Sequence, residues 1–148
     1  MSTVSELRTY DRAEPLYLVE ITLIGEGAPV LCFAERGITV DGIVYEPYLS
    51  GIYGVEEFGL SNSGGLDMSI RISFLNEPWG MYSRLSEVGD DYPFEGAAFS
   101  LREVYIGIDG EPSASGLLCR GVLDGLSSID LMGFQAEVVS PEFRAGIT

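Results

Sequence analysis

Two carboxylate doublets, Glu56-Glu57 and Asp90-Asp91, are the most chemically suggestive residues of this sequence. Paired carboxylates can flank a glycosidic bond, and calcium prefers oxygen ligands of this kind. Neighbouring residues of a strand point to opposite faces, however, so a doublet does not place two carboxylates on one side. The surrounding segments also lack the spaced ligands of an EF-hand. We therefore expect solvated carboxylates on loops or edges, without a metal site or a catalytic pair.

A group of aromatic residues is the second candidate site. Trp79, Tyr82 and Tyr92 could line a face that binds sugars, because aromatic rings stack well. Phe94 and Phe99 belong to the same part of the chain. Large aromatic residues more often pack in a core under a loop or in a subunit interface, and we favour this interpretation.

The composition excludes several common kinds of site. The chain has no histidine, so a Ser-His-Asp or Cys-His arrangement is impossible within it. Cys32 and Cys119 lie in apolar stretches, which favours reduced, buried thiols, and a disulfide between them stays an open alternative. The glycine-rich stretch 59–65 contains no lysine and does not resemble a phosphate-binding loop. We expect no metal, no cofactor and no enzymatic activity.

The charge balance is strongly acidic. The 148 residues include 23 acidic and 8 basic ones, the formal net charge is −15, and every basic residue is an arginine. Such a surface repels nucleic acid and anionic membranes, because both are bound through cations. No apolar run approaches the roughly 18 residues of a membrane helix. We predict no sequence-specific nucleic-acid binding and no membrane contact.

The elements that must position these residues are short strands. Ile38–Val40 and Ile43–Tyr45 flank Asp41-Gly42, a two-residue connection that suits a type I′ hairpin turn. Pro47 has no N–H to give, so it should close the second of these strands or place it at a sheet edge. Branched and aromatic residues, or alternation of apolar and polar ones, predict further strands. These are 16–24, 30–34, 52–58, 66–75, 97–109, 116–130 and 133–140.

One short helix is predicted over 76–88. Asn76 could cap it and Pro78 suits its first turn, while Trp79, Tyr82 and Leu85 recur at helical spacing. The segment 110–115 is predicted to be a turn. About eight or nine short strands with one short helix are typical of a small β-barrel or sandwich. We expect a single β-rich domain over 1–148, with a polar leader at 1–14 and a C-terminal arm at 141–148.

The order of these elements resembles the N-terminal region of baseplate or tail-tip hub proteins of tailed phages, of the siphophage type, and of gene-transfer agents. In that family a strand leads to an Arg-[Asp/Gly]-[Ile/Leu]-Thr-[Val/Leu]-Asp-Gly-x-x-Tyr segment, which is Arg36–Tyr45 here. A later apolar strand ends in a Phe/Leu-x-x-Gly-x-[Val/Leu] phrase, matched by Leu118–Leu123. The resemblance covers most of 16–126. The chain is shorter than the larger hub proteins and lacks the cysteines of those that hold an iron–sulfur cluster.

The resemblance implies a structural protein of the virion tail that is made in the host cytoplasm. It implies a homo-oligomeric ring of three-fold or six-fold symmetry around the DNA path, in contact with other tail proteins, as a hub, a distal tail ring or an adaptor. An acidic lumen would let DNA pass without binding it. A carbohydrate-binding module using the aromatic group is the alternative, and a carboxylate-based glycosidase is a third. The candidate lumen or rim charges are Glu56, Glu57, Asp90 and Asp91.

Overall fold

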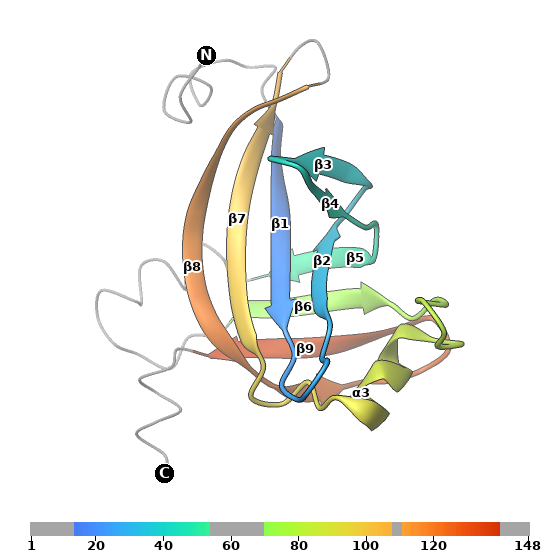
Figure 1. Cartoon of the computed structure of the whole chain (residues 1–148). Helices are drawn as coiled ribbons and strands as arrows, with labels where there is room; N and C mark the ends of the chain where they lie inside the picture. Colours follow the sequence, from blue (N-terminus) through green and yellow to red (C-terminus); the bar gives the residue numbers. More distant parts are fainter. Residues whose placement is uncertain (1–13, 54–69, 108–110, 140–148) are drawn as a thin grey trace.

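The computed structural model describes residues 14–53, 70–107 and 111–139 (Figure 1). They form a mainly β structure of nine strands and one short α-helix, which confirms the predicted class. In the described residues the main sheet does not close on itself, so the structure is sandwich-like rather than a barrel. No helix among these residues is long and apolar enough to cross a membrane.

The main sheet has seven antiparallel strands. Each strand is hydrogen-bonded to the strands beside it in the sheet, and several of these neighbours are far apart in the sequence. Across the sheet the order is β2 (Val30–Ala34), β1 (Glu14–Thr22), β7 (Ala98–Ile106), β8 (Pro112–Ser127), β9 (Gly133–Val139), β6 (Ile70–Leu75) and β5 (Leu49–Tyr53).

Figure 1 shows that the sheet folds over into two layers whose strands cross. β2, β1 and β7 form one layer, β9, β6 and β5 form the other, and the long β8 curves from the first toward the second. The pairing of β8 with β9 is irregular between Leu123 and Leu126, and Gly125 has φ +116°. Such a bulge bends a strand sharply, which is how a single strand can serve both layers of an orthogonal sandwich.

The main core contains alternate residues of these strands, because successive side chains of a strand point to opposite faces. Val19 and Ile21 of β1 belong to it together with Ile70 and Phe74 of β6, and all four are buried. Leu18 points to the other face of β1 and belongs to a second, smaller cluster.

A separate hairpin covers that second cluster. β3 (Ile38–Val40) pairs with β4 (Ile43–Tyr45), as the sequence predicts. The connecting residues Asp41 and Gly42 have φ of 52° and 79°, the positive angles that a type I′ turn requires. Val40 and Tyr45 are buried against Leu18 in the cluster.

Glu46, the residue after the hairpin, attaches it to the sheet. The Glu46 N–H donates to the Cys32 carbonyl over 2.9 Å, and the Ala34 N–H donates to the Glu46 carbonyl over 2.8 Å. These hydrogen bonds occupy part of the β2 edge that β1 does not use. They also fix the hairpin above the outer face of β1.

The predicted helix over 76–88 is wrong for most of its length. Helical structure begins at the 3₁₀ turn η1 (Leu85–Glu87) and continues in α3 (Val88–Asp91). Upstream, Trp79 and Tyr82 exchange two backbone hydrogen bonds of 3.1 and 2.9 Å across a tight turn. Gly80 in that turn has φ +56°, which no right-handed helix contains. The helical spacing identified side chains that pack inward but not the path of the backbone.

Several strand limits also differ from the prediction. β1 begins at Glu14, which the sequence assigns to the leader, and it ends at Thr22. Proline is tolerated at position 15 because β1 pairs with β2 only from Leu18 onward. At Pro15 the side of β1 that faces away from β7 has no partner strand, so no N–H is needed there. β8 begins at Pro112, inside the predicted turn over 110–115, and ends at 127. β5 begins at Leu49, three residues before the predicted start at 52.

Some predictions fall outside the described residues. They concern the leader up to residue 13 and the C-terminal arm over 141–148. Parts of four predicted strands also lie outside, at 54–58, 66–69, 108–109 and 140.

Candidate functional site

Of the two carboxylate doublets, the one in the described residues does not form a metal site. Asp90 and Asp91 are both exposed on α3, and Asp91 accepts a hydrogen bond from the Tyr82 hydroxyl over 2.7 Å. Glu56 and Glu57 lie outside the described residues. No three acidic, cysteine or histidine side chains of the described chain are grouped so that they could hold a metal ion. A role for these carboxylates at a lumen or rim stays a prediction.

Trp79 and Tyr82 form a ring pair at the two ends of the tight turn. Their ring centroids are 6.4 Å apart and the ring planes make an angle of 25°. Both side chains are half-buried and pack against the edge of the main core. Nearly parallel rings that stay partly exposed offer an apolar surface on which a sugar ring can stack.

Hydrogen bonds to two carboxylates hold the ring pair in place. The indole N–H of Trp79 donates to a carboxylate oxygen of Glu46 over 3.1 Å. The hydrogen bond from Tyr82 to Asp91 is the main reason that the pKa of Tyr82 is raised to about 12. The pair is therefore flanked by acidic groups from the end of the hairpin and from α3, both of which could also accept hydrogen bonds from sugar hydroxyls.

Tyr92, the third predicted aromatic residue, packs at a different place. Its ring lies over the turn between β1 and β2, so that a Cβ added at Gly25 would be 3.1 Å from the Tyr92 Cδ1 atom. Gly25 has φ +135°, so the backbone and the ring both favour glycine there. The structure thus brings Trp79 and Tyr82 together and gives Tyr92 a packing role next to this turn.

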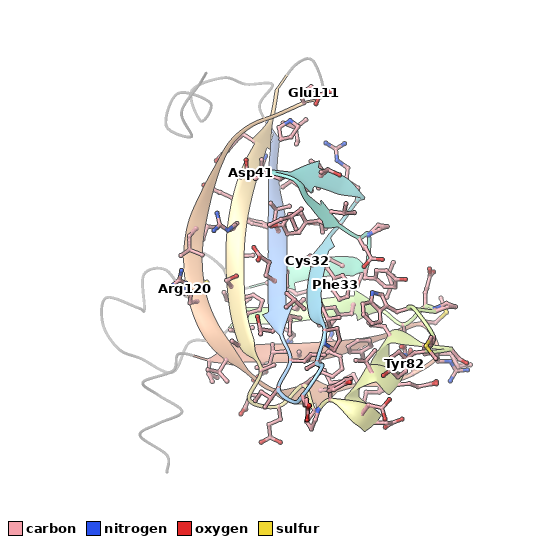
Figure 2. All side chains as sticks on the ribbon, viewed as in Figure 1. Cys32, Phe33, Asp41, Tyr82, Glu111 and Arg120 are labelled. Carbon is pink, nitrogen blue, oxygen red and sulfur yellow. The ribbon has the colours of Figure 1, made fainter. Side chains whose placement is uncertain are left out.

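A small pocket beneath the β3–β4 hairpin was missed by the sequence reasoning. Its volume is about 180 Å³, which is below the roughly 300–1,000 Å³ of most ligand sites but enough for a few water molecules or a small polar group. The labelled Asp41 in Figure 2 marks the hairpin turn above it. The pocket is lined by Leu18, Glu20, Val40, Asp41, Ile43, Tyr45 and Arg102.

Glu20 is the centre of a polar network in this pocket. The Tyr45 hydroxyl donates to Glu20 Oε2 over 3.0 Å, and Arg102 Nε lies 3.5 Å from the same oxygen. Burial, followed by the hydrogen bond to Glu20, raises the pKa of Tyr45 well above its usual range. Only part of this pocket can be predicted from the sequence. Leu18 and Glu20 share one face of β1, but the residues that cover this face are decided when the hairpin folds back over it.

Both cysteines are free thiols, on the non-adjacent strands β2 and β8. Burial raises the pKa of Cys119 to about 11. Burial, with smaller contributions from Glu20 and Glu46, raises the pKa of Cys32. A raised pKa keeps a thiol protonated at neutral pH, so neither cysteine has the character of an activated nucleophile.

Two binding arrangements therefore stand out in the described residues, the exposed ring pair and the polar pocket. The first offers a stacking surface between carboxylates, and the second offers a carboxylate that an arginine and a buried phenol already satisfy. In comparisons with known proteins, no family model matches the chain and no curated protein is similar to it.

Proposed function

We propose that this protein is a structural component of a phage tail tip or baseplate, a hub or a distal tail ring, that assembles into an oligomeric ring around the DNA path. The sequence resemblance over Arg36–Tyr45 and Leu118–Leu123 supports the proposal. The first of these segments is the hairpin and its approach, and the second is the central part of β8.

The acidic surface is the observation that carries the proposal. Among the acidic side chains described between residues 15 and 139, Glu103 alone is buried, at 6% exposure. The other acidic side chains of this described part lie wholly or partly in solvent, so it presents an acidic surface. A ring of such subunits repels the phosphates of passing DNA, whereas a basic wall would bind them.

The mass of the purified chain, measured by light scattering, tests this proposal. Copies of charge −15 repel each other, and salt shortens the range of this repulsion from about 30 Å at 0.01 M to about 8 Å at 0.15 M. We therefore expect a discrete three-fold or six-fold oligomer that forms more completely at the higher salt concentration. Negative-stain images of the same sample should show rings with a central opening.

A gel-shift assay with duplex DNA provides the second measurement. The acidic lumen predicts no retardation of the DNA at either salt concentration. A chain that stays monomeric over the whole salt range, or that retards DNA, would contradict the proposal.

A carbohydrate-binding module is the second candidate, and the ring pair of Trp79 and Tyr82 is the observation that favours it. A glycan array is the direct test. Trp79→Ala should abolish binding with the fold intact, because it removes half of the stacking surface. Tyr53→Ala is the matched control, since Tyr53 is an aromatic residue of β5 that is 57% exposed. Equal binding by the two variants, or no bound glycan at all, would eliminate this candidate.

A further inference from the structure

The loop between β8 and β9 presents large apolar side chains to solvent. Ile129 is 56% exposed, Leu131 65% and Met132 81%. Met81, which is fully exposed, belongs to the tight turn between Trp79 and Tyr82. In Figure 1 that turn and the start of β9 lie at the same end of the molecule. We call these four side chains the apolar end. Apolar groups gathered on a surface commonly mark an interaction site.

Asp130 holds the loop in one conformation. Its carboxylate Oδ1 accepts hydrogen bonds from the backbone N–H groups of Met132 and Gly133, over 2.8 and 2.9 Å. Its own N–H donates to the Gly133 carbonyl over 2.9 Å. The two hydrogen bonds to the carboxylate lower the pKa of Asp130, so this group stays ionised and in place at neutral pH.

Asn76 joins this loop to the neighbouring segment. Asn76 is 4% exposed, and its side-chain amide donates to the Asp130 carbonyl over 2.8 Å. Its side-chain oxygen accepts from the Ser86 N–H over 2.9 Å, and its backbone N–H donates to the Met132 carbonyl over 3.1 Å. The exposed side chains are therefore carried by a fixed backbone. A surface that is already ordered loses less conformational entropy on binding.

The charges around the apolar end indicate the kind of partner. Residues 76–91 and 128–133 contain five acidic residues and one arginine, so their formal charge is −5 + 1 = −4. A second copy that docks through this same end brings the same charge there and is repelled, and so is an anionic membrane. A protein surface with lysine and arginine around an apolar centre is attracted and matches both features. The six charged residues are Glu77, Arg84, Glu87, Asp90, Asp91 and Asp130.

We propose that the apolar end is the docking surface for a different protein, whose contact surface has an apolar centre and a basic border. The proposal goes beyond ring assembly, because it concerns a contact between unlike chains. It stands or falls separately, since a monomeric chain could still dock such a partner.

Two synthetic amphipathic helical peptides serve as probes. One combines leucine with lysine, and the other has glutamate in place of every lysine. Fluorescence anisotropy at physiological salt measures their binding to the wild-type chain and to the double variant Leu131→Ser/Met132→Ser. Val44→Ser is the matched control, because Val44 is 64% exposed on the β4 strand of the hairpin. All substituted side chains are exposed, so the Tm of each variant should equal that of the wild type. Thermal unfolding therefore serves as the control for folding.

We expect the leucine–lysine peptide to bind the wild type and Val44→Ser equally, and the double variant about tenfold more weakly. The leucine–glutamate peptide should not bind. Equal weakening by Val44→Ser, no effect of the double variant, or equal binding of the two peptides overturns the proposal. Analytical ultracentrifugation and sedimentation with anionic vesicles test the other occupants. Self-association or vesicle binding that the double variant abolishes would replace the proposed partner by a second copy or a lipid surface.

Discussion

At the scale of single residues, a polar network around Glu20 covers part of the outer face of β1. Glu20 would be an exposed carboxylate if the hairpin did not cover it, and its position between Val19 and Ile21 gives no hint of a partner. The hairpin places the Tyr45 hydroxyl 3.0 Å from Glu20 Oε2, while β7 supplies Arg102. A carboxylate that accepts a hydrogen bond from a phenol and pairs with an arginine can be taken partly out of water without a large cost. The Asp41-Gly42 turn was predictable, but this network was not, because it depends on three separate elements.

Tyr45→Phe tests the contribution of the network. The ring is 2% exposed and keeps its packing in the variant, whereas the hydrogen bond to Glu20 is lost. We expect the free energy of unfolding in urea to fall by about 1–2 kcal/mol at pH 8. The folded-state pKa of Tyr45 is raised above its ordinary value of 10.0, so this stabilisation is complete below pH 10 and declines as the pH rises further.

The difference between wild type and Tyr45→Phe should therefore narrow above pH 10. Tyr53→Phe is the control, because Tyr53 is 57% exposed, and it should leave the unfolding free energy nearly unchanged. A difference between wild type and Tyr45→Phe that stays constant with pH would show that the hydroxyl acts in some other way.

At the scale of elements, local pattern and long-range contact gave different information. Runs of branched and aromatic residues, with the Asp41-Gly42 turn, located β2, β3 and β4, which have the predicted limits. Helical spacing over 76–88 failed, because Gly80 and the Trp79–Tyr82 bonds make a tight turn and Asn76 bonds to a distant loop instead of capping. A residue 54 positions away is invisible to any reading of local sequence. The ring pair was predictable as a group of aromatics, but its geometry was not.

Asn76→Ala tests whether Asn76 fixes the apolar end. The variant leaves the Asp130 carbonyl and the Ser86 N–H without their partner in a place where Asn76 is 4% exposed. We expect the unfolding free energy to fall by about 1–3 kcal/mol. Hydrogen exchange at the Ser86 amide should accelerate by more than the global loss of stability accounts for.

Gln135→Ala is the control for Asn76→Ala. The Gln135 side-chain amide donates to the Ser73 hydroxyl over a long 3.4 Å, and the loss of this hydrogen bond should cost much less. If the two variants lose the same stability and the Ser86 amide exchanges as in the wild type, Asn76 does not hold the loop.

At the scale of the whole molecule, composition predicted the class of fold but not the arrangement of strands. The main sheet pairs β1 with β7 and β6 with β9, and it bends at the irregular pairing of β8 near Gly125. Such pairings join residues far apart in the chain, and periodicity within one segment contains no information about them. The charge, in contrast, is a property of the whole sequence, and its consequences can be argued directly.

A formal charge of −15 on 148 residues predicts that salt stabilises the folded monomer. Carboxylates crowded on a compact surface repel each other more strongly than along an unfolded chain, and screening reduces this difference. We expect the Tm to rise by roughly 5 °C between about 0.01 M and 0.5 M NaCl, measured at dilutions where light scattering finds a monomer.

A charge-reversal variant separates this effect from other actions of salt. Glu26, Glu35 and Asp90 are exposed, and replacing all three by lysine changes the net charge from −15 to −15 + 6 = −9. The variant should melt at a higher temperature than the wild type at low salt and respond less to added salt, because less repulsion is left to screen. If both proteins gain the same Tm with salt, general charge repulsion does not limit the stability of this fold. In that case the acidic surface does not destabilise the fold, and no functional role is needed to explain why it is retained.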